Sequence, residues 1–378
     1  MHIIADENIP FVKTAFSTVG SVDVLPGRQI THADLQTADI LLVRSVTAVN
    51  QTLLQNTPVK FVGTATIGYD HIALDYLQQQ RIGFANAPGC NATSAAEYVI
   101  SALLVMAQRR DFELSQKTVG IIGCGNVGSR VLQKLNALGI KCLIYDPPLQ
   151  AKQPDVHTFV DLDTVLTADV VTLHVPLEKQ GDHPTYHLVN QAFLDKLSDD
   201  AILINTARGD VIDEAALFTA LEKHPNLSVI LDVWPQEPNI NLDLLQKVEL
   251  ATPHIAGYSF DGKVLGTQMI YQAVCHYFGF SPTWDKHTFL PEPPLKKLVF
   301  TDSATDEMAL FKAVMACYDI RQDDAKLRLI TQKQKIGEFF DHLRKHYPLR
   351  REFSCVTVDV PQEKQQLMSW LRGLGFQV

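Results

Sequence analysis

Three side chains that could together carry out acid/base chemistry follow three successive apolar segments of this chain. Arg208 follows AILINTA at 201–207, Glu237 comes shortly after SVILDV at 228–233, and His254 follows VELATP at 248–253. An imidazole exchanges protons near neutral pH, a nearby carboxylate favours its charged form, and a guanidinium offers a fork of donors that matches a carboxylate. Together these residue types suit acid/base chemistry on an anionic substrate.

Each of these residues also has an ordinary interpretation. Arg208 could be a surface cation or a contact to a cofactor phosphate, Glu237 a solvated loop acid between two prolines, and His254 a cap at a strand end. Their position favours chemistry, because each follows an apolar segment that could be a strand, and the carboxyl ends of parallel strands line the ligand crevice in α/β folds. An alcohol oxidised there would lose its proton to neutral His254 and its hydride to an acceptor.

A site for that acceptor is indicated by TVGIIGCGNVGSRVLQKLNALGIKCLIYD, residues 118–146. Gly123, Gly125 and Gly128 form GxGxxG between an apolar strand and an amphipathic helix. Glycines there permit a tight turn and bring a pyrophosphate close to the N-terminus of the helix. Asp146, at the end of the next strand, suits ribose hydroxyls and would repel a 2′-phosphate, so the pattern predicts NAD rather than NADP. The alternative is a glycine turn in an ordinary βαβ unit.

The elements that must position these groups alternate along most of the chain. Helices are expected at 92–110 and 264–278. Strands are expected at 2–6, 39–45, 60–65, 81–88, 118–123, 141–146, 170–175, 201–207, 228–233 and 248–253. Such alternation predicts an α/β fold with two Rossmann-like, doubly wound parallel-sheet domains and a cleft between them.

The last part of the chain has a different texture. A proline-rich stretch at 281–297 reads as an extended connection. The segments beyond it predict a small C-terminal α+β domain with amphipathic helices. They are LVF, DEMALFKAVMACY, KIGEFFDHLRKHY, FSCVTVDV and QQLMSWLRGLG.

Composition and charge argue against several other classes of protein. A net charge of −9 disfavours a general nucleic-acid binder. The longest apolar run, from Tyr98 to Ala107, is about half the length that spans a bilayer. Six scattered cysteines without CxxC give no structural metal site, and MHIIADENIP is no secretory signal. We therefore expect a cytoplasmic protein with no metal and no membrane or nucleic-acid partner.

The order and spacing of GCGNVG, NTARGD, DVWPQEP and PHIAGYS resemble the D-isomer-specific 2-hydroxyacid dehydrogenase family over residues 40–280. The resemblance implies NAD-dependent oxidation of a 2-hydroxy acid. It implies that Arg208 binds the substrate carboxylate, that His254 is the acid/base, and that Glu237 holds and charge-balances His254.

The same resemblance implies further cofactor contacts. Asp232 would contact the nicotinamide carboxamide, and Gly257 would allow close approach of the backbone. Val175 is also expected at the cofactor, although threonine is common at this position in the family and valine offers no hydroxyl. The remaining expected contacts are Asn126, Val127, Thr206, Ala207 and Arg208.

Finer features resemble the members of the family that oxidise 4-phospho-D-erythronate to 2-oxo-3-hydroxy-4-phosphobutanoate in pyridoxal 5′-phosphate biosynthesis. These features are VRSVTAVN, GTATIGYDH, PGCNATSAAEYV, HIAGYSFDGK and the long tail. They imply that Ser45, Thr66 and Tyr258 contact the substrate. To these we add Arg44 for the phosphate, because a doubly anionic group favours charge-assisted bonds; Arg44 could equally form a strand-end salt bridge.

The resemblance also implies a division of the chain. Residues 1–92 with 255–285 would form the substrate-binding domain, 93–254 the NAD-binding domain, and 286–378 the dimerisation domain of a homodimer.

Two other functions compete with this interpretation. A related enzyme, such as a 3-phosphoglycerate dehydrogenase with a regulatory tail, would share the catalytic residues but differ at the substrate loops. An NAD-sensing protein or corepressor built on the same fold would have no need to keep Arg208, Glu237 and His254 together.

Overall fold

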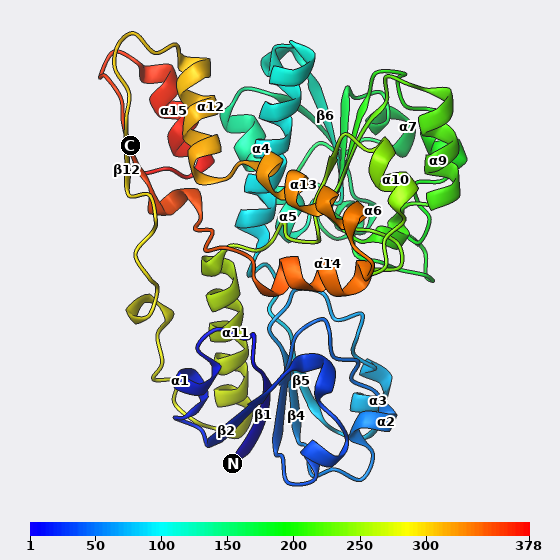
Figure 1. Ribbon diagram of the computed structural model, residues 1–378, viewed down its shortest axis with the longest axis vertical. Helices are drawn as coiled ribbons and strands as arrows, with labels where there is room; N and C mark the ends of the chain where they lie inside the picture. The colour runs from blue at the N-terminus through cyan, green and yellow to red at the C-terminus, as the bar shows by residue number, and fades with distance from the viewer. The chain divides into compact units, whose positions relative to one another are not determined.

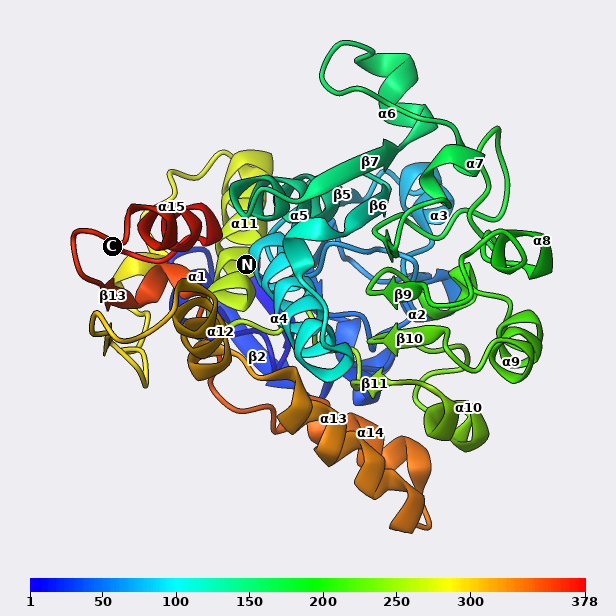
Figure 2. The ribbon, with the colours of Figure 1, turned by 90° about the horizontal axis from the view of Figure 1, so that it is seen from above.

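The computed structural model describes residues 1–378, which form two compact units (Figures 1 and 2). The first unit contains Met1–Asn91 and Ser259–Glu292, and the second contains Ala92–Tyr258 and Pro293–Val378. Each unit is therefore assembled from two separate stretches of the chain.

The first unit is built on a five-stranded parallel sheet with the order β2-β1-β3-β4-β5. Helix α11 packs against β4 and β5, so the central strands are covered and their residues are apolar and buried. Strand β2 (SVDVL) was not predicted; it lies at the sheet edge and is only partly buried. The strands are β1 His2–Asp6, β2 Ser21–Leu25, β3 Ile40–Val43, β4 Phe61–Thr64 and β5 Gly83–Ala85; the helices are α1 Val12–Phe16, α2 Gln51–Leu54, α3 Leu74–Gln79 and α11 Phe260–Phe278.

The second unit contains a six-stranded parallel sheet with the order β11-β10-β9-β8-β6-β7. The six strands and the helix at 92–110 are as predicted, although β11 is only two residues long. The strands are β6 Thr118–Ile122, β7 Lys141–Tyr145, β8 Val170–Leu173, β9 Ile202–Asn205, β10 Ser228–Leu231 and β11 Leu250–Ala251. The helices are α4 Ala92–Arg110, α5 Asn126–Ala137, α6 Pro147–Lys152, α7 Leu162–Val165, α8 Gln191–Leu194, α9 Glu214–Lys223 and α10 Leu242–Lys247.

Two apolar clusters cover the faces of this second sheet. One joins strand residues such as Ile121 and Ile204 to α4 and α5, and the other joins Leu173 and Leu203 to α9 and α10. The strand order reverses between β6 and β8, so the carboxyl ends of these two strands flank the switch point at which ligands bind in doubly wound sheets.

The C-terminal region packs within the second unit, and its predicted mixture of helices and strands is confirmed. It comprises β12 Lys297–Val299, α12 Asp306–Cys317, α13 Ile320–Arg328, α14 Ile336–Lys345, β13 Thr357–Asp359 and α15 Gln365–Leu374. Strands β12 and β13 form a parallel pair. Gly373 of α15 lies so close to Ala137 of α5 that a Cβ atom would overlap it. Helix α13, which was not predicted, runs beside β11 (Figure 2).

The connections between these elements contain single turns of 3-10 helix: η1 Gly27–Gln29, η2 Ala33–Leu35, η3 Leu114–Gln116, η4 Gly209–Val211, η5 Lys286–Thr288, η6 Leu329–Gln332 and η7 Phe353–Cys355. None of the helices combines the length and the apolar character that a membrane crossing requires. Nowhere do three or more His, Cys, Asp or Glu side chains gather as a set of metal ligands.

Candidate active site

The glycine-rich turn connects β6 to α5 and has the geometry of an anion site. Gly123 has a φ of 87°, and a Cβ atom there would lie 2.9 Å from the backbone of His174. A Cβ atom on Gly128 would overlap the carbonyl oxygen of Gly123, whereas Gly125, the N-cap of α5, faces open space. The backbone N–H groups at the start of this 12-residue helix are thus accessible, and Asn126 and Val127 form its first turn. These residues fit a dinucleotide pyrophosphate.

Asp146 lies directly after β7, as expected, but its carboxylate also organises the turn. Its Oδ2 accepts a hydrogen bond from the backbone N–H of Cys124 at 2.7 Å, and its Oδ1 accepts one from Leu149 at 2.9 Å, which caps α6. Each carboxylate oxygen can accept a second hydrogen bond. Asp146 therefore fixes the turn and still has capacity for ribose hydroxyls.

His174, directly after β8, is a half-buried histidine that the sequence interpretation missed. Its Nε2 lies 3.0 Å from Oγ1 of Thr172, and its Nδ1 lies 3.1 Å from Oγ1 of Thr206 at the end of β9. Burial lowers the pKa of His174 to about 3, so the imidazole is neutral. It ties the ends of two neighbouring strands together behind the glycine turn. The available signal was its place, directly before Val175, at the end of a strand beside the switch point.

Val175 lies against the glycine turn. Its Cγ1 atom lies 2.9 Å from where a Cβ of Gly123 would be. The valine side chain can therefore make apolar contact with a bound cofactor in place of the hydroxyl contact that threonine would offer.

Arg208 follows β9 and is held by its own loop. Its backbone is extended, its carbonyl accepts a hydrogen bond from Nδ2 of Asn205 at 2.9 Å, and its Nη1 donates to the carbonyl of Ala207 at 2.7 Å. The next residue, Gly209, lies against the backbone of Trp234 with no room for a Cβ atom. The loop after β9 is therefore locked to the loop after β10, which carries Glu237.

Glu237 and His254 form a hydrogen-bonded pair. Oε2 of Glu237 lies 2.7 Å from Nδ1 of His254, and Oε1 accepts the backbone N–H of Trp234 at 2.8 Å. His254 has a φ of 56°, in the left-handed region that side chains rarely adopt. Burial opposes the charge of Glu237, but the charge and hydrogen bond of His254, the charge of Arg344 and the Trp234 N–H together hold its pKa below the usual value. Glu237 is thus an anion fixed at both oxygens.

Asp232, buried at the end of β10, holds the loop that carries His254. Its Oδ1 accepts from Oγ1 of Thr252 and from the N–H of Ile255, both at 2.7 Å, and its Oδ2 accepts from the N–H of Ala256 at 2.9 Å. Burial raises the pKa of Asp232, although these donors and His254 oppose the rise. Gly257 and Tyr258 follow directly, so the whole TPHIAGY turn is organised around one carboxyl group.

The candidate substrate residues of the first unit follow β3 and β4. Arg44 and Ser45 open a turn closed by the hydrogen bond from the N–H of Thr47 to the carbonyl of Arg44 at 3.2 Å. Oγ1 of Thr66 donates to the carbonyl of Gly68 at 2.8 Å and lies 2.7 Å from Oγ1 of Thr64. Both groups stand at the carboxyl edge of their sheet, which is the ligand-binding edge of this fold.

Two protein-family models match this chain. The NAD binding domain of the D-isomer specific 2-hydroxyacid dehydrogenases matches residues 95–256. A domain of unknown function matches residues 289–375.

Curated proteins match this chain over its full length, and solved structures match about three quarters of it. An erythronate-4-phosphate dehydrogenase of Marinobacter nauticus is 48% identical over 100% of both chains, and that of Proteus mirabilis is 45% identical over 100% of this chain and 99% of its own. A structure of D-lactate dehydrogenase from Aquifex aeolicus complexed with NAD and lactic acid covers 74% of this chain and 96% of its own, with a TM-score of 0.62 and 26% identity. NAD⁺-bound 3-phosphoglycerate dehydrogenase of Entamoeba histolytica, at 24% identity, covers 74% of this chain and 95% of its own with a TM-score of 0.64, and shares the fold. The chain therefore belongs to the D-isomer-specific 2-hydroxyacid dehydrogenase family, has erythronate-4-phosphate dehydrogenases as full-length relatives, and is an NAD-dependent dehydrogenase.

Proposed function

We propose that this enzyme oxidises 4-phospho-D-erythronate to 2-oxo-3-hydroxy-4-phosphobutanoate with NAD, as a step of pyridoxal 5′-phosphate biosynthesis. The observation that carries the chemistry is the Glu237–His254 hydrogen bond of 2.7 Å in the unit that contains the glycine turn. The choice of substrate is supported by full-length relatives that are named erythronate-4-phosphate dehydrogenase.

The pair defines how the proton moves. A carboxylate can only accept, so Nδ1 of His254 carries the hydrogen that faces Glu237 and Nε2 keeps a free lone pair. Nε2 takes the proton of the substrate 2-hydroxyl while the hydride leaves carbon 2. The resulting imidazolium is stabilised by the Glu237 carboxylate, and in the reverse direction it returns the proton to the carbonyl oxygen.

Arg208 and the cofactor complete the reaction. The guanidinium of Arg208 would bind the substrate carboxylate as a fork and orient carbon 2. NAD, when bound, accepts the hydride. The residues proposed to hold it are those of the glycine turn, with Asn126 and Val127, and the residues that follow the strands, which are Asp146, Val175, Thr206, Ala207, Arg208, Asp232 and Gly257.

The remaining assignments belong to the same proposal. Ser45, Thr66 and Tyr258 would contact the substrate, and Arg44 its phosphate. Residues 1–92 with 255–285 would bind substrate, 93–254 would bind NAD, and 286–378 would join two copies into a homodimer. A reducing cytoplasmic setting is supported by six cysteines that are all free thiols.

The test is NADH formation by the purified full-length enzyme with 4-phospho-D-erythronate, 3-phosphoglycerate and D-lactate, each compared by kcat/KM. We expect 4-phospho-D-erythronate to exceed the other two at least tenfold. A higher kcat/KM for 3-phosphoglycerate would assign the enzyme to the other substrate.

A further inference from the structure

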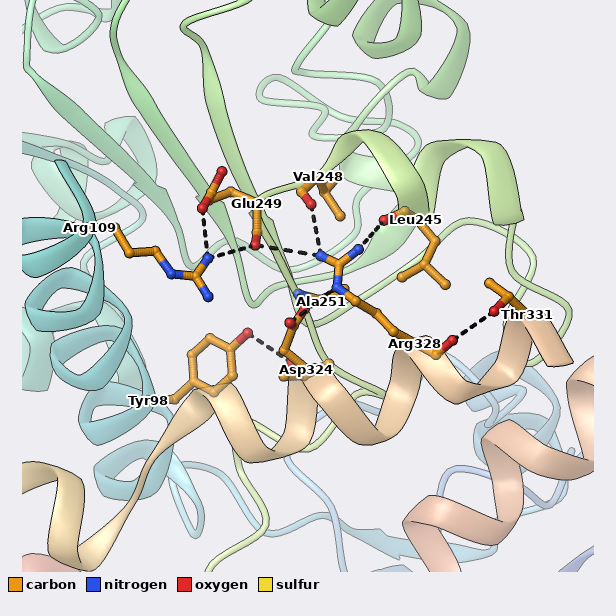
Figure 3. A network of polar contacts seen from close by, with 10 residues as sticks. Tyr98, Arg109, Leu245, Val248, Glu249, Ala251, Asp324, Arg328 and Thr331 are labelled. Carbon is orange, nitrogen blue, oxygen red and sulfur yellow. Dashed lines mark hydrogen bonds and ion pairs between the residues drawn. The ribbon is translucent and has the colours of Figure 1, made fainter.

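The C-terminal region contacts the loop of the proposed catalytic histidine at several places. On strand β11, just before that loop, the N–H of Ala251 donates to Oδ1 of Asp324 at 2.8 Å. Arg328, one helical turn along α13, donates to the carbonyls of Leu245 and Val248 at 2.9 Å (Figure 3). Helix α13 therefore fixes the segment that leads into the loop.

A second contact is made by Arg350, which follows α14. Its Nη1 donates to the carbonyl of Ala256 at 3.1 Å, and its Nη2 donates to the carbonyl of Ser94 at 2.7 Å. The side chain is buried and its guanidinium lies 3.6 Å from the ring centre of Tyr318. The loop is thus held from the C-terminal region within two residues of His254.

Helix α14 packs directly on the loop that carries Glu237. A Cβ atom on Gly337 would lie 2.7 Å from Oδ1 of Asn239 and 3.2 Å from Cγ of Pro238. Phe340 of the same helix is completely buried in one apolar cluster with Trp234. Trp234 is the residue whose N–H holds Oε1 of Glu237.

Arg344, in the last turn of α14, lies beside Tyr258 and close enough to Glu237 for its charge to act on that carboxylate. Its guanidinium carbon lies 5.7 Å from the ring centre of Tyr258, to which it also hydrogen-bonds, and its charge acts on Glu237. Its Nε is buried and has no hydrogen-bond partner. An arginine nitrogen that is buried without a hydrogen-bond partner destabilises a fold, which points to a role of this side chain in the site.

We propose that Arg344 is a positioning residue of the acid/base pair: it orients Tyr258 and keeps Glu237 in the anionic form that holds His254. This proposal rests on the proposed function of the pair. It makes α14 part of the active site, in addition to any role of the C-terminal region in dimerisation.

The charges around the pair set the direction of the expected effect. Glu237 faces His254 and Arg344, His254 also faces Asp232, and Arg344 also faces Asp341 and the Tyr258 hydroxyl. Removing the positive charge of Arg344 makes it easier for the pair to retain a proton. The acid limb of kcat/KM for alcohol oxidation must then move to higher pH.

The experiment compares Arg344→Met, Arg344→Lys and the control Lys345→Met in the full-length enzyme. Lys345 is the exposed next residue of the same helix, so its replacement removes the same charge from outside the site. We measure kcat, KM, the NAD dissociation constant and the pH profile of kcat/KM. Arg344→Met should lower kcat at least tenfold, move the acid limb up by about half a pH unit, and leave NAD affinity within twofold. Arg344→Lys should keep the limb in place, and Lys345→Met should match the wild type.

An Arg344→Met enzyme with wild-type kcat and an unmoved acid limb would overturn the proposal. So would equal losses in Arg344→Met and Lys345→Met. Should Arg344→Met fail to fold, Arg344→Gln takes its place, because it removes the same charge but keeps hydrogen-bond donors, and the same outcomes support or overturn the proposal. Should the wild type prefer another 2-hydroxy acid, only the proposed substrate is wrong, and the same comparison is made with the preferred acid.

Discussion

Replacing Glu237 by glutamine tests the proposed mechanism most directly. The substitution keeps the shape of the side chain but removes the charge that faces Nδ1 of His254 at 2.7 Å. A hydrogen bond to a charged group contributes about 1.5–3 kcal/mol. Because 32% of the His254 side chain is exposed, solvent screening favours the lower part of this range.

The second contact of Glu237 adds to the loss. The N–H of Trp234 at 2.8 Å needs an acceptor, so the amide oxygen should remain there and the NH₂ group should turn toward His254. A donor facing Nδ1 favours the tautomer with hydrogen on Nε2, which cannot accept the substrate proton. Reversing this tautomer costs about another 0.5–1.5 kcal/mol. Together the two effects give about 2–4 kcal/mol, or a fall in kcat of about 30- to 1000-fold.

The assay is steady-state NADH formation across pH, with Glu249→Gln as the matched control. Glu249, directly before β11, pairs with Arg109 of α4 at 2.6 Å and has no place in the proposed site. For Glu237→Gln we expect unchanged NAD affinity and an acid limb of kcat/KM displaced to lower pH, because the imidazolium loses its counter-charge. A decrease of less than threefold would show that Glu237 does not support His254 in catalysis.

Four further outcomes are expected. His254→Gln should lose about 10²- to 10⁴-fold in kcat and still bind NAD with wild-type affinity in a fluorescence titration; near-normal turnover would remove it from the mechanism. Asp146→Ser should lower the ratio of NAD to NADP affinity, whereas Asp146→Asn, which keeps an acceptor for the turn, separates the loss of charge from the loss of structure; an unchanged ratio in both contradicts the assignment. His174 has a pKa of about 3 in the folded enzyme against 6.5 normally, so the unfolded chain binds the extra proton and stability falls as pH drops below 6.5. In urea unfolding, the free energy of unfolding of His174→Gln should therefore fall about 1 kcal/mol less than that of the wild type between pH 7.5 and 5.5, and identical decreases would refute a neutral imidazole in the folded enzyme. Arg44→Ala should reduce the preference for 4-phosphoerythronate over erythronate in kcat/KM, and an unaltered preference would leave the phosphate to other residues.

Sequence patterns predicted the second sheet well because its strands are short, apolar and covered on both faces. They missed β2, where SVDVL at a sheet edge alternates with a charge, and α13, where IRQDDAKLR is too polar to show an apolar face. In α13 the polar residues Asp324 and Arg328 serve the backbone around β11 instead of solvent. Such a use depends on a distant partner, which no local pattern contains.

The candidate site, too, was predicted only in part from the sequence. Placing Arg208, Glu237 and His254 at neighbouring strand ends required only strand periodicity and the rule that ligands bind at that edge. Other features could be recognised only in the folded chain. They are the two backbone hydrogen bonds that Asp146 accepts, the contacts by which His174 joins two strand ends, and the position of Arg344 beside Tyr258 and Glu237. Arg344 lies 107 residues beyond Glu237 in sequence, in a region that the resemblance assigned to dimerisation.

The contact between Asp324 and Ala251 also has a consequence for pairing between sheet edges of different molecules. Strand β11 is the last strand of its sheet, and a sheet edge with unused hydrogen-bonding groups is a template for pairing with another chain. Asp324 occupies the Ala251 N–H, and Arg109 and Arg328 reach the carbonyl of Glu249 (Figure 3). Losing α13 through truncation or proteolysis would uncover that edge, so the shortened chain should aggregate as well as lose activity.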